Sequence, residues 1–351
     1  MIYSKKKKVL VIGTGRRTRG GITSVINAHR EGKQWKKFHC RWIETHCDSN
    51  LFIKMCYFLR AIIQYLCLLP FYDIIHFHFS ERSTALRKSI LMPIAKLMRK
   101  KIIVHFHAFS LDTTIRGAYK NIYNYLFNSA DVIIVLSEYW RKALVEECEI
   151  PYGKIKVLYN PCKMVPKNDR EKENNNEILF AGTLNHRKGY DDMIKAFAKI
   201  AHKYPEWKIV FAGNGEIEYG KKLSFNLGIS SQTVFLGWIS GNDKDKAFRR
   251  ATIFCLPSYA EGFPMSVLDA WSYGLPVITT PVGGIPDIAK NNLNVLLFPP
   301  GDIDALALQM DKMISDIRLR NLIASESLNL AKTTFNVNTI NRQLEDIYQN
   351  L

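Results

Sequence analysis

Acidic residues are scarce in the first part of this chain. Residues 1–160 hold 11 Asp and Glu against 27 Lys and Arg, whereas residues 161–351 hold 21 against 22, so almost the whole formal net charge of +17 lies in one half. Such a surface attracts nucleic acid, anionic lipid headgroups or acidic ligands, and dispersed lysines also keep a protein soluble. The aromatic residues near the charges belong to apolar periodic runs rather than to a stacking platform, which argues against single-stranded nucleic acid. We therefore expect an anionic membrane surface as a partner, and no nucleic acid.

Several common sequence signals are also missing. The four lysines at residues 5–8 run straight into an apolar segment with no small-residue cleavage site, so we expect no secretory signal. The seven cysteines include no C-x-x-C pair, which argues against a zinc module and fits a reducing cytoplasm. Low-complexity and collagen-like tracts are lacking, and 351 residues are more than one core usually fills. We expect a cytoplasmic protein with two domains.

Long apolar runs are limited to residues 51–72. Lys54, Arg60 and Gln64 interrupt this run at helical spacing and leave a narrow polar stripe. Two charges inside the segment make a membrane-spanning helix costly. Two interpretations stay open: a core helix packed on a sheet, which we favour, and an amphipathic helix that lies on a membrane.

The chain contains an alternation of strands and helices that occurs twice. Short β-branched runs that are apolar throughout predict parallel strands covered by helices on both faces. These runs are residues 7–13, 73–79, 101–109 and 131–137, and then 177–183, 208–215, 233–238, 252–258, 275–280 and 294–300. The predicted fold class is α/β, with two Rossmann-like doubly wound domains that face each other across a cleft, where the carboxyl ends of the strands would open.

The domain boundaries follow from the same pattern. The first domain is predicted at residues 1–162 and the second at 178–330. Residues 163–177 have almost no apolar side chains and predict an exposed linker. Residues 331–351 predict a C-terminal helix that could return to the first domain.

The segment PSYAEGFPMSVLDAWSYGLPVITTPVGGIPD at residues 257–287 contains a well-marked helix start. Pro264 is expected at the first helical position and Gly274 just past the last turn. The N–H groups that would face out of this helix start belong to residues beside the proline, namely Phe263, Met265 and Ser266. The dipole at such an end favours an anion, and a diphosphate is of the right kind.

Two carboxylates flank that helix start. Glu261 is expected in the loop before it, and Asp269 about two turns into the helix. At that separation they cannot share one proton, as a closely paired dyad would. We expect them to bind two different hydroxyl-bearing parts of one ligand.

These residues resemble glycosyltransferase family 4, the retaining nucleotide-sugar transferases with the GT-B fold. The resemblance runs nearly end to end and depends on three blocks, at 181–197, at 211–215 with 235–238, and at 261–288. In that family the first acidic residue of an E-x7-E motif binds the donor sugar, and the second binds the nucleotide ribose. The resemblance therefore implies that Glu261 binds the sugar and Asp269 the ribose, although Asp269 is one methylene shorter than the usual glutamate.

The family also has a cationic pair in its nucleotide-binding domain. Lys188 matches the family lysine, whereas Thr183 stands where the arginine is usual, and Arg187 could supply that charge from next door. Positive charge is needed here because a departing nucleoside diphosphate leaves negative charge to be neutralised. Taken without the surrounding blocks, the pair would be read as two surface residues.

The resemblance assigns further positions. Gly20 and Gly21 resemble the glycine-rich loop that lets the backbone approach the donor phosphates, although the spacing is not that of a dinucleotide fingerprint. His107 matches a histidine near the donor sugar. The residues expected to line the nucleotide and its base are Gly213, Asn214 and Ile239. The other strand histidines, His76, His78 and His105, are expected to be packed and hydrogen-bonded.

The resemblance implies a retaining hexosyl transfer from a nucleoside diphosphate sugar, with no cofactor. We expect no metal, because the Asp-x-Asp patterns at 243–245 and 302–304 fall at predicted helix starts. The basic first half would receive the acceptor, a glycan or lipid-linked saccharide of cell-surface polysaccharide synthesis, with the protein peripheral on the inner face of the membrane. Two alternatives stay open: a nucleotide-sugar epimerase of the same fold and a non-enzymatic basic scaffold.

Overall fold

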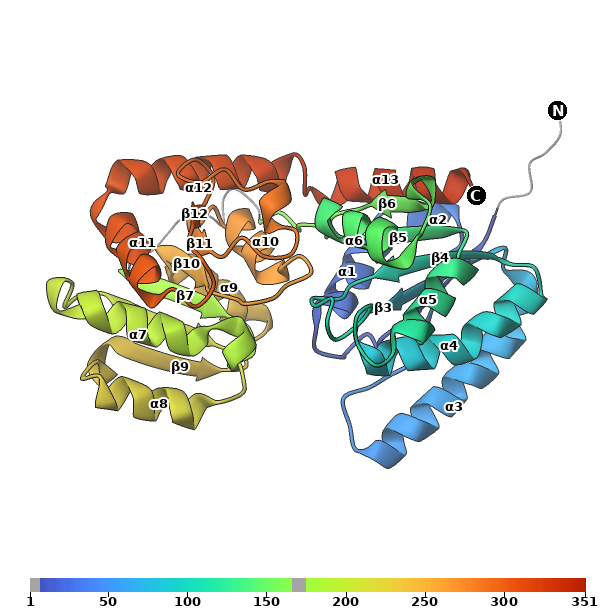
Figure 1. The fold of residues 1–351 in the computed structure, drawn as a ribbon, viewed down its shortest axis with the longest axis horizontal. Helices are drawn as coiled ribbons and strands as arrows, with labels where there is room; N and C mark the ends of the chain where they lie inside the picture. The colour runs from blue at the N-terminus through green and yellow to red at the C-terminus, as the bar shows by residue number, and fades with distance from the viewer. Residues whose placement is uncertain (1–6, 166–174) are drawn as a thin grey trace. The chain divides into compact units, whose positions relative to one another are not determined.

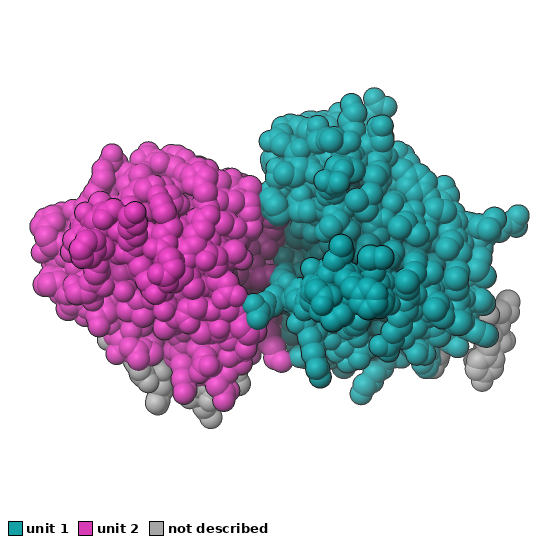
Figure 2. All heavy atoms as spheres, turned by 90° about the horizontal axis from the view of Figure 1, so that it is seen from below, with its two compact units in different colours: residues 1–161, 337–351 teal, residues 162–336 magenta. Residues whose placement is uncertain are grey.

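The computed structural model describes residues 7–165 and 175–351, and the chain forms two compact units. Unit 1 comprises Met1–Pro161 and Val337–Leu351, and unit 2 comprises Cys162–Asn336 (Figures 1 and 2). Residues 166–174 of the predicted linker lie outside the described residues. Its last residue, Glu177, already belongs to a strand, so the linker prediction ran too far.

Unit 1 is built on a six-stranded parallel sheet with the order β2-β1-β3-β4-β5-β6. Its strands are β1 Val9–Gly13, β2 Arg41–Glu44, β3 Ile74–Phe79, β4 Lys101–Phe106, β5 Val132–Val135 and β6 Ile155–Val157. Its helices are α1 Gly21–Arg30, α2 Lys33–Lys37, α3 Leu51–Leu68, α4 Arg82–Leu97, α5 Lys120–Ser129, α6 Glu138–Cys148 and α13 Val337–Gln349.

The strands of unit 1 are apolar on both faces because each face packs into a core. One face joins Leu10, Phe77 and Val104 to α4, α5 and α6. The other face includes Val11 and Ile103 and is covered by α1 and α13. The last helix of the chain thus completes the core of the first unit.

Unit 2 contains a second six-stranded parallel sheet, with the order β12-β11-β10-β7-β8-β9. Its strands are β7 Glu177–Ala181, β8 Lys208–Ala212, β9 Thr233–Gly237, β10 Ile253–Leu256, β11 Val277–Thr279 and β12 Leu296–Leu297. Its helices are α7 Tyr190–Ile200, α8 Ile217–Asn226, α9 Gly241–Arg250, α10 Met265–Ser272, α11 Ile303–Ser315 and α12 Ile317–Lys332. Both units are doubly wound α/β structures, which confirms the predicted fold class.

The strand order of unit 2 reverses between β7 and β10. Chain segments leave these neighbouring strands toward opposite sides of the sheet, and a crevice opens between the loops that follow them. The loop after β7 contains Lys188, and the loop after β10 contains Glu261. The topology therefore brings together residues that are 73 positions apart in the sequence.

Helix α3 is not the packed core helix that we favoured from the sequence. Along its 18 residues only Ala61 and Tyr65 are buried, whereas Leu51 and Phe52 are each 74% exposed. The segment Leu51–Phe71 is long and apolar enough to cross a membrane by length and composition, which by itself is weak evidence. The prediction failed because hydrophobicity along a helix does not show whether a partner covers it.

Candidate active site

Glu261 is the buried centre of a polar cluster at the switch point of unit 2. It is 7% exposed. Ser258 Oγ donates a hydrogen bond of 2.7 Å to its Oε1, and the Lys188 ammonium forms an ion pair with the same oxygen. Arg187 Nη1 lies 3.8 Å from Oε2. The structure thus brings together three predicted site residues, with two cations against one carboxylate.

The short helix η4, His186–Lys188, holds the two cations in place. Asn185 caps it, because its Oδ1 accepts a hydrogen bond from the Lys188 N–H at 3.1 Å. Gly189 follows with φ +67°, and a Cβ there would lie 2.0 Å from the Pro257 carbonyl oxygen. Only glycine allows this approach of the two loops.

The loop after β10 is bonded directly to η4. The Tyr259 N–H donates to the Arg187 carbonyl at 2.8 Å, and Arg187 Nη1 donates to the Ala260 carbonyl at 2.6 Å. Arg187 is therefore partly engaged with the backbone that carries Glu261. Its side chain does turn inward, as its use in place of the family arginine requires.

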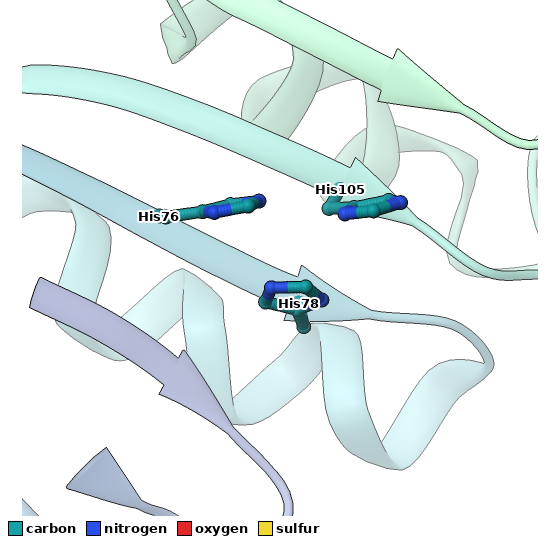
Figure 3. Close-up of side chains that lie close together, drawn as sticks. All are labelled: His76, His78 and His105. Atoms are coloured by element: carbon teal, nitrogen blue, oxygen red, sulfur yellow. The ribbon is translucent and has the colours of Figure 1, made fainter. Parts of the chain in front are cut away.

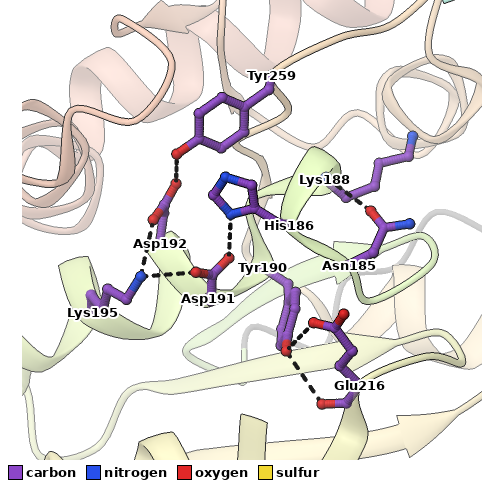
Figure 4. Close-up of polar contacts among 9 residues, drawn as sticks. All are labelled: Asn185, His186, Lys188, Tyr190, Asp191, Asp192, Lys195, Glu216 and Tyr259. Atoms are coloured by element: carbon purple, nitrogen blue, oxygen red, sulfur yellow. Dashed lines mark hydrogen bonds and ion pairs between the residues drawn. The ribbon is translucent and has the colours of Figure 1, made fainter. Parts of the chain in front are cut away.

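A second set of contacts fixes the start of α7, which follows η4 in the chain (Figure 4). Lys195 bridges Asp191 and Asp192 at 2.8 and 3.4 Å, and the Tyr259 hydroxyl donates to Asp192 at 2.7 Å. His186 Nδ1 lies 3.8 Å from Asp191. These acids occupy the first turn of α7, where the helix dipole favours negative charge. Burial, together with the hydrogen bond that Tyr259 donates to Asp192, raises the pKa of Tyr259 to about 12, so its hydroxyl remains a donor.

The loops after β7 and β8 also touch. A Cβ on Gly213 would lie 1.7 Å from the Gly182 carbonyl oxygen, and the Leu184 N–H donates to the Asn214 carbonyl at 2.7 Å. The Tyr190 hydroxyl donates to Glu216 Oε2 at 3.0 Å. Gly213 and Asn214 therefore lie beside the loop that leads to η4, whereas Ile239 follows β9 and is half-buried.

Helix α10 begins one residue later than predicted. Pro264 occupies the N-cap with φ −71° and ψ 114°, rather than the first helical position, because its ψ is extended. Met265 and Ser266 are the first two helical residues, and the first intrahelical bond comes from the Val267 N–H to the Pro264 carbonyl at 3.2 Å. Phe263 is 4% exposed, and its ring packs on Phe335. The helix ends as predicted, with Gly274 at φ +66° after Tyr273.

Asp269 lies in the fifth position of α10, little more than one turn in rather than two. Its carboxylate is paired with Lys244 on α9 at 2.5 Å. The loop of Gly283 packs on the loop that carries Glu261, because Gly283 has φ +59° and a Cβ there would lie 2.2 Å from the Glu261 carbonyl oxygen. The Gly284 N–H donates to the Gly262 carbonyl at 2.8 Å.

The remaining predicted site residues lie in unit 1. Gly20 is the N-cap of α1 with φ +139°, and Gly21 is its first residue, so these glycines mark a helix start after β1 as expected. His107 follows β4, and its Nε2 lies 3.0 Å from His78 Nδ1. Burial, together with the neighbouring His29, lowers the pKa of His107 to about 3, so its ring is neutral near pH 7.

Three buried histidines of unit 1 could hold a metal ion as far as their donor atoms are concerned. One ring nitrogen from each of His76, His78 and His105 lies within 4.8 Å of the others (Figure 3). Burial lowers the pKa of all three well below the usual value, so the three rings are neutral near pH 7. Neutral imidazoles do not compensate the charge of a metal ion. An ion bound by these three rings alone would therefore keep its full charge at a buried position in the basic half of the chain, which costs free energy.

The prediction that these histidines are hydrogen-bonded is wrong for one of them. His76 Nδ1 pairs with the Tyr348 hydroxyl at 2.7 Å, and His78 pairs with His107. Both ring nitrogens of His105 are buried without a hydrogen-bond partner among the described residues. The ring of His105 stacks instead on those of its neighbours, with the His107 centroid 4.2 Å away.

Three of the four aspartates in the Asp-x-Asp patterns lie at helix starts, as predicted, whereas Asp245 lies in the fifth position of α9. Asp302 caps α11 by accepting from the Ala305 N–H at 2.9 Å, and Asp243 lies in the first turn of α9. Asp245 binds Arg249 and the Tyr273 hydroxyl, both at 2.6 Å.

Sequence reasoning missed three side chains of this site. Ser258 and Asn185 adjoin predicted residues, and their types are typical of caps and short polar contacts, so a closer search of the loops could have found them. Lys244 lies 25 residues from Asp269, with no local pattern to connect the two.

The chain belongs to glycosyltransferase family 4. Residues 18–163 match the family model described as Glycosyltransferase Family 4, and residues 165–328 match the one described as Glycosyl transferases group 1. The described residues also have the GT-B fold. A TM-score of 0.76 relates the chain to Anabaena Alr3699/HepE in complex with UDP-glucose, at 20% identity over 98% of this chain and 100% of the other. Sucrose-phosphate synthase from Thermosynechococcus elongatus gives 0.79 at 16% identity, over 98% of both chains.

Similar sequences include proteins named as glycosyltransferases. The uncharacterized glycosyltransferase MJ1607 of Methanocaldococcus jannaschii is 31% identical over 244 residues, which cover 60% of this chain and 60% of that protein's own length. An uncharacterized 41.2 kDa protein in the cps region of Klebsiella pneumoniae is 26% identical over 86% of this chain and 89% of its own. An Escherichia coli UDP-Gal:alpha-D-GlcNAc-diphosphoundecaprenol alpha-1,3-galactosyltransferase is 24% identical over 79% and 75%.

Proposed function

We propose that the protein transfers a hexose from a nucleoside diphosphate sugar to an acceptor hydroxyl with retention of anomeric configuration. The observation that carries this proposal is the group of Lys188 and Arg187 around the buried Glu261 at the switch point of unit 2. Such crevices hold nucleotides in doubly wound sheets. A UDP-sugar is the first donor to test, because a neighbour of this fold is described in complex with UDP-glucose.

Each residue of the group has a separate task in this proposal. The Lys188 ammonium and the Arg187 guanidinium neutralise the diphosphate as the bond between the sugar and the phosphate breaks. The N–H groups of Met265 and Ser266 add the partial positive charge of the N-terminal end of α10. Glu261 accepts hydrogen bonds from sugar hydroxyls. Without a ligand its charge is compensated by Lys188, so donor binding would exchange one anion for another at that lysine.

Retention would come from attack on the same face as the departing diphosphate, which takes up the acceptor proton. The bond from the anomeric carbon to the phosphate oxygen breaks while the bond to the acceptor oxygen forms. The diphosphate gains one negative charge when it leaves, and the proton it takes from the acceptor hydroxyl balances that charge. In this proposal the cations do the neutralising and no metal ion or cofactor is needed. His107, with Gly20 and Gly21, would contribute from unit 1 to binding the donor sugar and its phosphates.

We propose a lipid-linked saccharide as the acceptor, with the protein peripheral on the cytoplasmic face of the membrane. The relative that acts on a diphosphoundecaprenol-linked sugar supports this class of acceptor, and the relative from a cps region supports cell-surface polysaccharide synthesis. The excess of basic residues in the first 160 residues favours the same surface.

The test is a thermal-shift screen of nucleoside diphosphates and their sugars, followed by transfer assays with a lipid-linked acceptor. A ligand of the folded state raises the melting temperature. We expect one diphosphate sugar to do so in the wild type and to fail in Lys188→Met. Conversion of the donor without any acceptor would instead identify an epimerase, and a lack of any nucleotide effect would contradict the proposal.

A further inference from the structure

The outward face of α3 is apolar along its whole length, whereas a helix face that contacts water usually carries polar side chains. The side chains at helical spacing on that face are Phe52, Met55, Leu59, Ile63 and Leu66, with exposed fractions of 74, 57, 57, 64 and 47%. Their intervals of three and four residues place them in one stripe. Single exposed apolar residues are ordinary, but a continuous stripe of this length marks a surface that something covers.

The inner face of α3 is firmly attached to unit 1. Ala61 and Tyr65 are buried in its core, and the Tyr65 hydroxyl donates to the Leu91 carbonyl on α4 at 3.0 Å. The Tyr57 hydroxyl donates to Glu44 at 2.9 Å. To span a bilayer the helix would have to leave these contacts, so the structure favours a helix that lies on a surface and keeps its inner face packed.

The apolar surface continues past the end of α3. Phe71 follows it and is 69% exposed, and Leu97 at the end of α4 is 83% exposed. Lys100 Nζ donates to the Pro70 carbonyl at 3.1 Å, which holds the end of α4 beside this segment, and Figure 1 shows α3 running along α4. Exposed apolar side chains and the ammonium of Lys100 therefore lie together at this end.

A basic pocket adjoins the polar edge of α3. Its volume is ≈ 250 Å³, and it is lined by three arginines and one acid, together with aromatic, amide and aliphatic side chains. The arginines are Arg16, Arg41 and Arg60, and the acid is Glu44, which pairs with Arg16 at 3.2 Å. Guanidinium groups suit phosphate oxygens because their planar fork donates two hydrogen bonds at once.

We propose that the α3 surface, made of the outward stripe, Phe71, Leu97 and the arginine pocket, docks on a bilayer that contains anionic phospholipid. The stripe enters the boundary between headgroups and acyl chains while the pocket binds a lipid phosphate. An apolar stripe bordered by arginines fits this partner, because it offers hydrocarbon and phosphate at adjacent depths. The proposal rests in part on the proposed function, to which it adds the surface that meets the membrane.

Flotation with vesicles tests the proposal in the absence of donor and acceptor, so that its failure and a failure of the transferase proposal are distinguishable. We expect the full chain to float with vesicles of phosphatidylcholine and phosphatidylglycerol at low salt. Binding to phosphatidylcholine alone should be at least tenfold weaker. Equal binding to both compositions, or to neither, would overturn the proposal.

Matched variants locate the surface. Leu59→Gln with Ile63→Gln should lower binding to anionic vesicles at least tenfold, and both side chains are exposed, so the melting temperature should hold. The control Phe225→Gln with Leu308→Gln changes two side chains of similar exposure, 75 and 64%, in unit 2, and should bind like the wild type. Arg60→Gln should weaken binding to anionic vesicles, whereas Lys142→Gln, on a side chain that is 75% exposed, should not.

The alternative partner of the α3 surface is a second copy of the chain, and the experiment must distinguish it from a bilayer. Sedimentation without vesicles should give a monomer for both the wild type and the α3 double variant. A wild-type dimer that the double variant abolishes would make the stripe a subunit interface and overturn the proposal. An α3 double variant that floats like the wild type would overturn it as well.

Discussion

The Lys244 ammonium on α9 lies 2.5 Å from the Asp269 carboxylate on α10. Lys244 is 40% exposed and Asp269 32%, so the pair stands at the surface of unit 2, where a ligand can reach it. An aspartate that replaces the glutamate usual in the family is thereby held in one orientation by a residue from another helix.

Asp269→Asn tests the assignment of this carboxylate to the nucleotide ribose. The ribose is remote from the bond that breaks, so the substitution should remove binding that the ground state and transition state share. We expect the donor KM to rise about tenfold and kcat to stay within about twofold, as measured by steady-state kinetics. Asp311→Asn, an acid of unit 2 that pairs with Lys203, serves as the control. A fall in kcat at unchanged KM would contradict the assignment.

Lys188→Met and Glu261→Gln test the ion pair between the partly buried Lys188 and the buried Glu261. Each change keeps the size of the side chain and removes one charge, and each should lower turnover by a factor on the order of a hundred or more. The exposed Lys221, also in unit 2, provides Lys221→Met as the control, with activity near that of the wild type. Wild-type turnover in either variant, with a melting temperature near that of the parent protein, would refute its role.

The buried histidines of unit 1 predict a loss of stability in acid. Burial lowers the pKa of His29 to about 4, and that of His107 to about 3, so below pH 6.5 the unfolded chain binds protons that the folded chain does not. The free energy of unfolding should therefore fall as pH drops from about 6.5 toward 4, by on the order of 1 kcal/mol per pH unit for each histidine.

His105→Leu tests this origin of the acid sensitivity, because both ring nitrogens of His105 lack a hydrogen-bond partner among the described residues. Removing the ring should make the dependence on pH less steep when unfolding is followed by urea titration at several pH values. His202→Leu, at an exposed position, should leave the slope as it is. An equally steep slope in His105→Leu would show that the sensitivity arises elsewhere.

Lys88 predicts a substitution that stabilises the protein. Its side chain is fully buried, its Nζ donates to Thr45 Oγ1 at 2.7 Å, and burial together with the nearby Arg87 lowers its pKa well below the usual value. The unfolded chain therefore binds this proton more tightly, so retaining Lys88 costs stability increasingly as pH falls below its usual pKa.

Lys88→Met should raise the free energy of unfolding at pH 7 by about 1–3 kcal/mol, as measured by chemical denaturation. Lys96→Met, at an exposed position on the same helix, should change it little. A less stable Lys88→Met protein would mean that the hydrogen bond to Thr45 outweighs the cost of burial.

Much of the fold could be predicted because its signals are local. Continuous β-branched runs identified ten of the twelve parallel strands among the described residues, and Gly274 marked the end of α10, since these depend on neighbours in the chain. The short strands β2 and β6 were missed, because Arg41–Glu44 and Ile155–Val157 include charged residues and are not continuous apolar runs. The pairing of Glu261 with Lys188 was within reach once the strand order was known. The position of Pro264 was misjudged by one residue, because helix boundaries depend on ψ at the cap.

The amino-acid sequence by itself determined where strands and helices form, which half carries the positive charge, and which residue types gather near one helix start. The tertiary structure decided which helices and side chains contact one another. Lys244 reaches Asp269 only because α9 and α10 pack on one sheet, and α3 shows its apolar stripe outward only because no other described element covers it. The physical reason is that periodicity fixes the faces of an element, whereas the partner of each face is set by how distant segments pack.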